Sequence, residues 1–401
     1  MSVDECAARS RELLRACVGP RGLVASADFA HYGVVWARDA AVSGLGALAS
    51  GDEELVAAVV DTLDLLAETA SPHGQIPAVV DARRGTRDFG EGGAVDPTPW
   101  FVILAGEYVD RTGDVGTAER WWSTIDAGMA WMACQDVTGS GLVSAAPSTD
   151  WMDAALTRSG RTLHLNVLYC WAARHAARLA RTFGARPRVD PDDLRRRIDL
   201  LFWPTPDRSP AELHDRGFIH GALPVAYWEA AQGDRRHFVS HVVHAAIVDR
   251  LDALANVLAI LVGIVDADRA IRVLDALDEL AVPYPTRSLD PPVRGADPDA
   301  MWIRSAEHVI PERWRNLPGR YHNGAVWPYI GALHAAAAAA AGDEGRARVL
   351  LGRVAQANRL GEDAPWGFHE WIDVEARPRG ATGQAWNAGA FLFAWERVRG
   401  R

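Results

Sequence analysis

The sequence predicts an all-α protein, arranged as a toroid of six helical hairpins with long loops on one face. Three observations support this prediction. Helical periodicity of apolar residues dominates the 401-residue chain, whereas strand signals are weak. The predicted helices come in pairs separated by short turns, and longer irregular stretches join one pair to the next. Because loops of that length inside a compact domain are usually functional, we expect them to carry the chemistry.

The individual helices follow from apolar spacing and from local start signals. The first, over residues 3–17, is amphipathic. Several others begin after a Gly-Asp pair such as Gly51-Asp52, because an aspartate side chain can cap the free N–H groups of a first turn. The Ala-rich run near 331–341 is too short to span a membrane and predicts a tightly packed helix. The other helices are expected at 40–50, 53–68, 97–111, 115–134, 162–184, 191–202, 251–263, 266–280, 323–341, 343–359 and 383–398.

The long connections define the rest of the organisation. They cover residues 71–96, 135–160, 203–240, 282–322 and 360–382, with short extended stretches expected near 22–36 and 140–146. No repeat, low-complexity linker or domain boundary is apparent, so residues 1–401 are predicted to form a single domain. Two helical domains divided near 203–240 are the alternative. The loops 203–240 and 282–320 are expected to cap the active site.

Composition narrows the classes of function. A net charge of −10 disfavours nucleic acid and anionic membranes, which require basic patches. The 16 Trp outnumber both the 10 Phe and the 7 Tyr. The flat indole with its N–H donor suits stacking on sugar rings, although most Trp side chains pack in a hydrophobic core. Cys6, Cys17, Cys134 and Cys170 lack metal-site spacing and predict buried, reduced thiols. With no secretory signal apparent, we expect a cytoplasmic protein.

Two acidic residues embedded among tryptophans carry the functional prediction. Asp153 lies in S-T-D-W-M-D-A, and Glu370 lies in P-W-G-F-H-E-W-I-D. Cleavage of a glycosidic bond needs such a pair, one carboxyl to protonate the leaving oxygen and the other to activate water or attack carbon. The apolar neighbours Trp151 and Met152 favour a raised pKa for Asp153, which is the state of a general acid. We therefore predict a glycoside hydrolase.

Local sequence leaves alternatives open for both carboxyls. Asp153 could instead be a turn or cap residue, and Asp150 is a competing acid. The competitors of Glu370 are the neighbouring acidic residues Glu362, Asp363, Asp373 and Glu375.

Two segments near the N-terminus offer groups that could grip sugar hydroxyls. In W-A-R-D-A, Arg38 supplies a donor and Asp39 an acceptor for adjacent hydroxyls. The competing interpretation of Asp39 is a helix cap. The segment D-P-T-P-W poses the same choice for Asp96 and Trp100.

A third segment, R-Y-H-N-G-A-V-W-P, is polar and aromatic before it becomes helical. Tyr321, His322 and Asn323 can hydrogen-bond a sugar, and Trp327 can stack on one. The alternative is a helix start with Asn323 as its cap.

Other chemistries lack their motifs. The sequence contains no phosphate-binding loop, no dinucleotide-binding glycine pattern and no G-x-S-x-G elbow. His237, His241 and His244 form the tightest histidine cluster, but without an H-E-x-x-H motif they are interpreted as structural. We therefore expect no metal and no cofactor, and a small carbohydrate as the partner.

In this order, the segments resemble those of six-hairpin glycosidases. W-A-R-D resembles their W-P-R-D segment, and D-P-T-P-W-F followed by E-Y-V-D-R-T-G-D resembles a stretch of the glycogen-debranching glucosidase domain. D-W-M-D-A followed by R-S-G-R-T-L-H-L-N resembles the catalytic-acid segment, and A-N-V-L-A-I resembles a helix of the alkaline/neutral invertases. Y-H-N-G-A-V-W-P is close to a segment shared with glycoside hydrolase family 63, and F-H-E-W-I-D followed by G-Q-A-W-N-A-G resembles the base segment. The resemblance spans residues 30–395.

The resemblance implies an (α/α)6 barrel and an inverting mechanism, with Asp153 as general acid and Glu370 as general base. Inversion predicts that the two carboxyls lie about 6.5–9.5 Å apart. Without an added carbohydrate-binding module or second catalytic domain, a small α-glycoside such as a disaccharide or a glycosylglycerate is favoured over glycogen. The residues expected around the pocket are Trp36, Arg38, Asp39, Asp96, Trp100, Trp151, Tyr321, His322, Asn323, Trp327, Gln384 and Trp386.

The chain departs from its relatives, and rival functions remain. His164 stands where relatives often carry Glu, which puts a subsite or a helix contact in doubt. One rival is a sugar epimerase on the same toroid, with His322 and His369 as acid and base. A phosphorylase is disfavoured by Glu370, because phosphate would replace the base. The last rival is a non-catalytic sugar-binding protein, which would leave the paired carboxyls unexplained.

Overall fold

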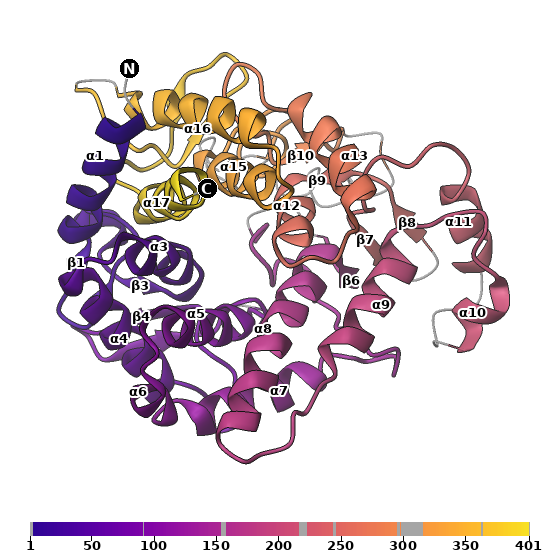
Figure 1. Cartoon of the computed structure of the whole chain (residues 1–401), viewed down its shortest axis with the longest axis horizontal. Helices are drawn as coiled ribbons and strands as arrows, with labels where there is room; N and C mark the ends of the chain where they lie inside the picture. The colour runs from indigo at the N-terminus through magenta and orange to yellow at the C-terminus, as the bar shows by residue number, and fades with distance from the viewer. Residues whose placement is uncertain are drawn as a thin grey trace.

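The computed structural model describes residues 3–90, 92–153, 158–215, 223–243, 246–294, 297, 316–361 and 364–400. Viewed end-on, its helices form a closed ring in two layers (Figure 1). This arrangement confirms the predicted all-α toroid.

Six helices form the inner layer of the ring. Each packs against the next, and the last packs against the first, which closes the ring (Figure 1). In chain order they are α3 (Ala37–Ser50), α5 (Pro97–Thr112), α8 (Leu163–Thr182), α12 (Ala253–Leu261), α15 (Pro328–Ala340) and α17 (Ala385–Arg399).

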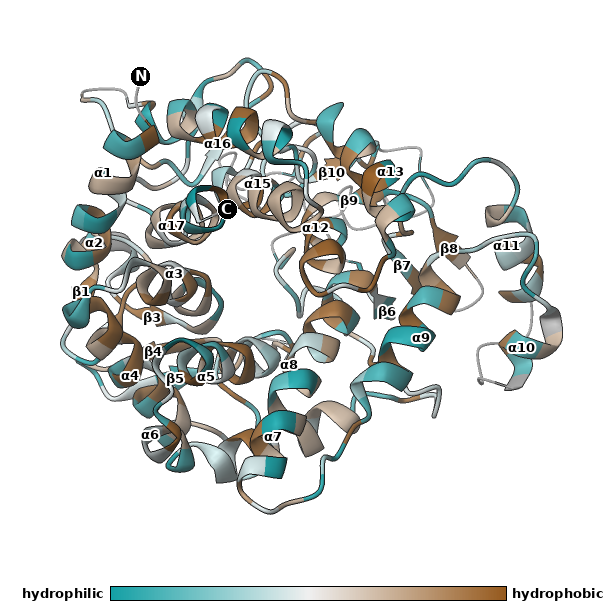
Figure 2. Cartoon of the chain, in the orientation of Figure 1, coloured by the Kyte–Doolittle hydropathy of each residue, from teal (hydrophilic) through white to brown (hydrophobic). Residues whose placement is uncertain are grey.

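The outer layer supplies one helix before each inner helix. These are α1 (Val3–Ala16), α4 (Glu53–Glu68), α7 (Trp122–Ala133), α9 (Pro191–Phe202), α13 (Ala267–Asp278) and α16 (Glu344–Arg359). Outer helices bury one stripe, as α13 does with Ala270, Val273, Leu274 and Leu277, whereas α15 is buried almost all round. Figure 2 accordingly shows teal and brown along α9 and α16, and a mostly tan α15.

Small residues let the inner helices approach closely where the ring closes. A Cβ added to Gly46 on α3 would lie 2.1 Å from the carbonyl oxygen of Gly389 on α17. A Cβ on Gly389 would in turn lie 2.4 Å from Cα of Ser43. Closure of the ring therefore depends on glycine at both positions.

Capping explains several of the helix starts that the sequence predicted. The carboxylate of Asp52 accepts hydrogen bonds from the N–H groups of Glu54 and Leu55 at the start of α4. Asp343 accepts from Arg346 N–H at the start of α16. The Gly-Asp pairs thus mark the short turns that lead from an inner helix to the next outer helix.

All the long connections run from an outer helix to the following inner helix. They consequently gather on one face, at the N-terminal ends of the inner helices. Short antiparallel strands pair within and between these connections. The paired strands are β1 (Val18–Gly19) with β2 (Gly22–Leu23), β3 (Val35–Trp36) with β4 (Val79–Asp81) and β5 (Thr86–Asp88), β6 (Arg161–Thr162) with β7 (His241–Val243) and β8 (Ala246–Val248), β9 (Leu251–Asp252) with β10 (Leu289–Asp290), and β11 (Trp371–Ile372) with β12 (Pro378–Arg379).

The structure differs from the prediction at a few elements. The predicted helix 323–341 begins only at Pro328, the first position of α15 and one that proline favours. The predicted helix 115–134 is divided into α6 (Val115–Glu119) and α7. Among the described residues, three short helices were not predicted, namely α2 (Phe29–Tyr32), α10 (Pro210–Asp215) and α11 (Leu223–Ala230).

Two further observations concern the loops and the thiols. Figure 1 shows α10 and α11 outside the ring, so any capping by loop 203–240 would come from its other residues, of which 216–222 lie outside the described ones. All four cysteines are free, but Cys134 is exposed, which corrects the prediction of four buried thiols. Among the described residues, no helix is long and apolar enough to cross a membrane.

Candidate active site

The predicted site residues gather where the inner helices begin. Trp36, Asp96, Trp327 and Gln384 directly precede α3, α5, α15 and α17, and none of these four side chains caps its helix. The helix-cap alternative for Asp96 is therefore excluded. Because N-terminal helix ends carry partial positive charge, several of them converging at one face favour a cluster of acidic groups there.

Arg38 is the cationic centre of this cluster. Its Nε donates to Asp96 Oδ2 at 2.7 Å and its Nη2 donates to Asp96 Oδ1 at 3.1 Å, a bidentate bond to a fully buried carboxylate. Its Nη1 lies 3.4 Å from Asp153 Oδ2. Arg38 thus connects α3, the start of α5 and the predicted acid segment.

Asp153 has the raised pKa that a general acid requires. Its side chain is 39% exposed, yet the carboxyl lies deep enough in the protein for desolvation to dominate. Burial raises its pKa to about 6; the Arg38 cation opposes this shift, and the charge of Asp96 adds to it. The local apolar neighbours named from the sequence, Trp151 and Met152, are both buried beside it.

Glu370 is held by two hydrogen bonds. Tyr321 donates its O–H to Oε1 at 3.3 Å, and the Ala381 N–H donates to Oε2 at 3.2 Å. Burial outweighs both bonds and raises the pKa of Glu370 to about 7, with a further contribution from the charge of Asp153. At Gly380 a Cβ would lie 2.3 Å from Glu370 Oε2, so this backbone approach excludes any side chain.

Asp39 is the third carboxyl of the cluster. Burial raises its pKa to about 7, Arg38 opposes the shift, and the charges of Glu370 and Asp153 add to it. Neighbouring carboxyl charges thus add to the raised pKa of Asp39 and of Glu370, and Arg38 opposes the shift for Asp39 and Asp153. Because these pKa values of about 6 to 7 lie close to neutral pH, the cluster can hold a proton for an acid and present a carboxylate as a base.

An aromatic cluster lies under these carboxyls. Trp151 meets the ring of Trp327 edge-on, with centroids 5.7 Å apart, and also contacts His322 at 5.0 Å. Tyr329 stacks on Trp386 with centroids 4.4 Å apart. Trp327 is 1% exposed and donates its Nε1–H to the carbonyl oxygen of Tyr321. The Trp151 and Trp327 side chains are thus covered by protein, so they shape the wall rather than offer an open stacking face.

Several buried polar atoms around this cluster have no hydrogen-bond partner among the described residues. Unpaired buried donors are uncommon in folded proteins, and here water or ligand hydroxyls would supply the missing acceptors. The atoms are Nε1 of Trp36, Trp100, Trp151 and Trp386, Nε2 of Gln384 and the hydroxyl of Tyr329.

Asn323 has a different place from the one expected. Its Oδ1 accepts from Val293 N–H at 2.7 Å, and its Nδ2 donates to the carbonyl oxygens of Val293 and Asn316. Its amide groups thus bind backbone, and it does not cap α15. His322 is buried, and burial with the charges of Arg38 and Arg158 keeps its pKa far below the usual value.

The competing acidic residues are bound elsewhere. Asp150 accepts from Arg158 Nε at 2.7 Å and from Met152 N–H. Asp373 receives bonds from Arg377 and Arg379. Glu375 is exposed and paired with Arg377. Glu362 and Asp363 lie outside the described residues. Among the described acidic residues of these segments, Asp153 and Glu370 are therefore the ones that belong to the cluster.

Two positions near the site have strained backbone. Tyr321 and Phe368 are non-glycine residues with φ of 46° and 42°. Tyr321 holds Glu370, a role that its sequence neighbours did not indicate. Arg158 was also missed, because nothing near it in the sequence shows that Asp150 and Asp252 both bind it.

His164, where the resemblance implied Glu, is fully buried on α8. Its Nδ1 lies 3.9 Å from Asp150 Oδ2. Burial, together with the cations Arg158 and Arg38, lowers its pKa far below the usual value, so the ring is neutral. A glutamate in this place would add another carboxyl next to Asp150.

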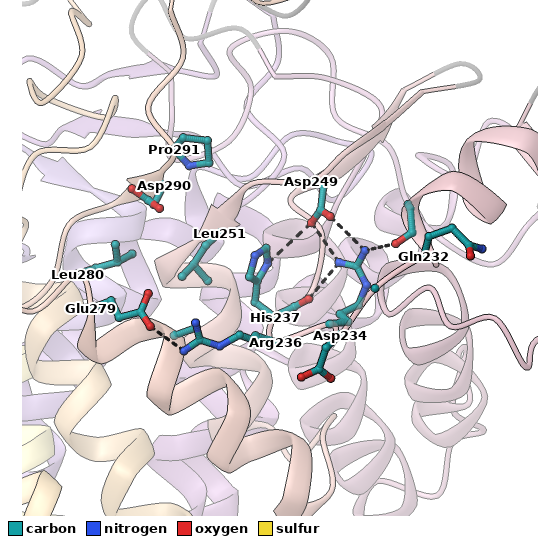
Figure 3. Close-up of a pocket in the computed structure, with 14 residues that line it drawn as sticks. Gln232, Asp234, Arg236, His237, Asp249, Leu251, Glu279, Leu280, Asp290 and Pro291 are labelled. Carbon is teal, nitrogen blue, oxygen red and sulfur yellow. Dashed lines mark hydrogen bonds and ion pairs between the residues drawn. The ribbon is translucent and has the colours of Figure 1, made fainter.

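A separate cavity of about 350 Å³ lies on the outer part of the same face, between the end of α11, the end of α13 and the β9–β10 pair (Figure 3). Its charged groups bind each other: Arg236 pairs with Glu279 at 2.8 Å, and Arg235 pairs with Asp249 at 3.0 Å. The cavity does not include the acid cluster. One group of described residues, Glu107, Asp110 and His175, has the spacing of metal ligands, and Arg178 already binds Asp110 there.

Comparison with protein families gives a match along nearly the whole chain. The sequence matches the family model described as amylo-α-1,6-glucosidase over residues 8–393. A search of curated proteins found no match.

Solved structures share the fold at low sequence identity. A family 63 mannosylglycerate hydrolase from Thermus thermophilus, in complex with glucose, superposes with a TM-score of 0.66 at 17% identity, covering 97% of this chain and 99% of that one. The same enzyme with Tris and D-glycerate gives a TM-score of 0.65 at 17% identity over the same shares. A family 78 rhamnosidase of Bacillus sp. GL1 gives 0.61 at 18% identity, covering 98% of this chain and 34% of that one.

Proposed function

Because the chain belongs to the amylo-α-1,6-glucosidase family and is thus a glycoside hydrolase, we propose that it is an inverting, exo-acting enzyme that cleaves a small α-glycoside. Asp153 is the general acid, and Glu370 is the general base. The observation that carries this proposal is that Asp39 and Asp153 lie beside Arg38 and interact with Glu370, and that each of these three carboxyls has a raised pKa.

In the proposed reaction, Asp153 donates its proton to the glycosidic oxygen as the bond to the anomeric carbon breaks. Glu370 takes a proton from a water that attacks the same carbon from the opposite face. The hydrogen bonds from Tyr321 and Ala381 N–H fix the Glu370 carboxyl for this role. Arg38 and Asp39 grip hydroxyls of the sugar, and Asp96 fixes the plane of the Arg38 guanidinium.

The remaining residues around the cluster are proposed to form the sugar subsite. Trp36, Gln384 and Trp386 offer polar hydrogens with no protein acceptor among the described residues. Trp100, Trp151, Trp327 and His322 support the wall from behind, and Asn323 holds the loop that carries Tyr321.

The proposed substrate is a disaccharide or a glycosylglycerate. The fold similarity to a mannosylglycerate hydrolase solved with D-glycerate motivates the second choice. Loops 203–240 and 282–320 are proposed to cap the leaving-group side, and the chain is proposed to act in the cytoplasm without metal or nucleic acid.

The first experiment is an incubation of the purified protein with α-linked disaccharides and glycosylglycerates, followed by proton NMR. We expect one substrate to release its sugar initially as the β-anomer. Initial release of the α-anomer would contradict inversion. Turnover confined to long glucans would contradict the small substrate, and a complete absence of hydrolysis would contradict the proposed function.

A further inference from the structure

A buried ion-pair network lies directly beside the proposed acid. Arg158 donates from Nε to Asp150 Oδ2 at 2.7 Å, and its Nη1 donates to Asp252 Oδ2. All three side chains are at least nine-tenths buried. A buried guanidinium between two buried carboxylates is costly to disrupt from either side, since a partner left alone keeps an uncompensated charge.

The network closes the loop that carries Asp153. Asp150 lies three positions before the acid, and Arg158 lies five positions after it. Asp150 also accepts from Met152 N–H at 3.1 Å, which ties the turn immediately before the acid. The ion pair therefore joins the two ends of the acid segment.

The third member anchors this closed loop to the rigid ring. Asp252 ends strand β9 and caps inner helix α12, where its Oδ1 accepts from Ala255 N–H at 3.1 Å. Strand β9 is itself paired with β10. Through Arg158, the acid segment is fixed to an inner helix rather than only to its own loop.

The direct contact of Asp153 with Arg38 is too weak to do the same. It is a single bond of 3.4 Å, whereas the bonds from Arg38 to Asp96 measure 2.7 and 3.1 Å. Arg38 is thus oriented by Asp96, and the place of Asp153 depends on its backbone.

From this geometry we infer that Arg158 is a positioning residue for the general acid, acting through Asp150 and Asp252. The inference rests on the proposed role of Asp153 as that acid. The planar guanidinium is essential, because it binds two carboxylates in different directions, and an ammonium at the end of a flexible chain does not hold the same geometry.

The test compares two α-glycosides of the same sugar. One has a sugar or glycerate leaving group, which needs protonation, and the other has a dinitrophenyl leaving group, which does not. We expect R158K and D252N to lower kcat on the first substrate by about ten- to a hundredfold, because a small misplacement of a reacting group has effects of that size. The dinitrophenyl substrate should be hydrolysed at a rate within about threefold of the wild type, with KM for both substrates little changed.

R346K is the matched control. Arg346 also binds two carboxylates, Asp275 at 2.6 Å and Asp278 at 3.2 Å, but it lies at the start of α16, away from the acid segment and from the loops proposed to cap the site. It should lower the melting temperature without changing the ratio of the two rates. Should R158K fail to fold, D252N carries the same test, because it removes a charge from the anchor and leaves the sequence from Asp150 to Arg158 unchanged.

D153N separates this inference from the proposed function. If D153N retains the full rate on the sugar substrate, Asp153 is not the acid and both conclusions fail. If D153N is selectively slow on that substrate while R158K and D252N slow both substrates equally, or neither, the acid stands and the positioning role of Arg158 is overturned.

Discussion

Helices α5 and α8 have acidic groups near both ends, with pKa values shifted in opposite directions. Near their N-terminal ends, Asp96 joins Asp39, Asp153 and Glu370 in what we call the upper cluster, where the pKa of Asp153 is raised. Toward their C-terminal ends lies what we call the lower group, Glu107, Asp110 and His175, in which Glu107 lies 3.4 Å from His175 Nε2. Burial acts to raise the pKa of Glu107, but the contact with His175 and the charges of Arg397 and Arg111 outweigh it, and the pKa is lowered.

The difference lies in the number of nearby cations rather than in burial. The lower group supplies partners for each acid, including Arg178, which binds Asp110 at 2.9 Å. In the upper cluster, Arg38 opposes the raised pKa of Asp39 and Asp153 but is already bound to Asp96, and Glu370 is held by Tyr321 and Ala381 N–H rather than by a cation. A shortage of cations keeps protons in the upper cluster, and that is the condition for acid-base catalysis.

The largest expected effect is the loss of catalysis at the upper cluster alone. D153N and E370Q should each lower kcat by about 10²–10⁴-fold, the range typical of a general acid or base. E107Q, at the lower group, should leave kcat within about twofold, since Glu107 has no part in the chemistry. Steady-state kinetics with circular dichroism of each variant will measure this, and near-wild-type turnover by D153N or E370Q would remove that residue from its role.

The next effect is a loss of stability at the lower group alone. A Cβ on Gly106 of α5 would lie 2.2 Å from the His175 ring on α8, so G106A should lower the free energy of unfolding by about 1–3 kcal/mol through overpacking. In G352A, where nothing lies within 4 Å of the added Cβ, the free energy of unfolding should rise by about 0.5–1 kcal/mol. Urea denaturation will measure both, and a reduced kcat in folded G106A would show that the two ends are not independent.

The pH profile reports the proton that the upper cluster retains. The productive state has Asp153 protonated and Glu370 ionised, so the pair carries one proton. Because Glu370 has the higher pKa of the two, this is the less populated of the two one-proton arrangements. The two carboxyls have pKa values of about 6 and about 7 and titrate together, so kcat/KM should be bell-shaped with its maximum between these values. A flat profile from pH 5 to 9, measured with enzyme shown to be folded throughout, would contradict the assignment.

The smallest effect is a displacement of one limb of that profile. The Tyr321 hydroxyl stabilises ionised Glu370, and so lowers its pKa. In Y321F the pKa of Glu370 should rise further above that of Asp153. The basic limb, which reports the higher pKa of the pair, should move upward, and the maximal kcat/KM should fall because a smaller share of the one-proton pair has Glu370 ionised. Y108F is the matched control, because Tyr108 binds Asp114 at the far end of α5. A downward shift in Y321F, or an equal shift in Y108F, would contradict this account of the base.

Much of the fold could be predicted because helices have local sequence signals, namely a periodic apolar stripe and a capping residue at the start. Outer helices such as α13 bury one stripe of apolar residues, and Asp52 and Asp343 mark their helix starts. The predicted start of α15 was too early because asparagine is a common helix cap. In the structure the Asn323 amide instead binds the backbone of Val293 and Asn316. The strands have only two or three residues each, too few for an alternating pattern to emerge.

The site could be predicted as residue types but not as contacts. Asp153 and Glu370 were distinguishable from Asp150 and Asp373 only by resemblance. Asp150 and Asp373 are bound by Arg158 and Arg379, and the sequence does not show which acid an arginine side chain will bind in the folded protein. Trp327 was expected to stack on a sugar, yet its ring is covered by protein. Burial of this kind depends on all the surrounding helices, and no local pattern encodes it.

The closure of the ring also has a consequence for biosynthesis. Helix α17 packs on both α1 and α3, and Trp395 on α17 donates to Asp4 on α1 at 3.2 Å. Asp39 lies on the first inner helix, and Glu370 lies in the last connection. A nascent chain on the ribosome therefore carries half of its reactive centre from early on. It gains the other half only when the final hairpin emerges and packs against the first helices. Prematurely terminated chains should therefore be unable to close the ring and should be catalytically inactive.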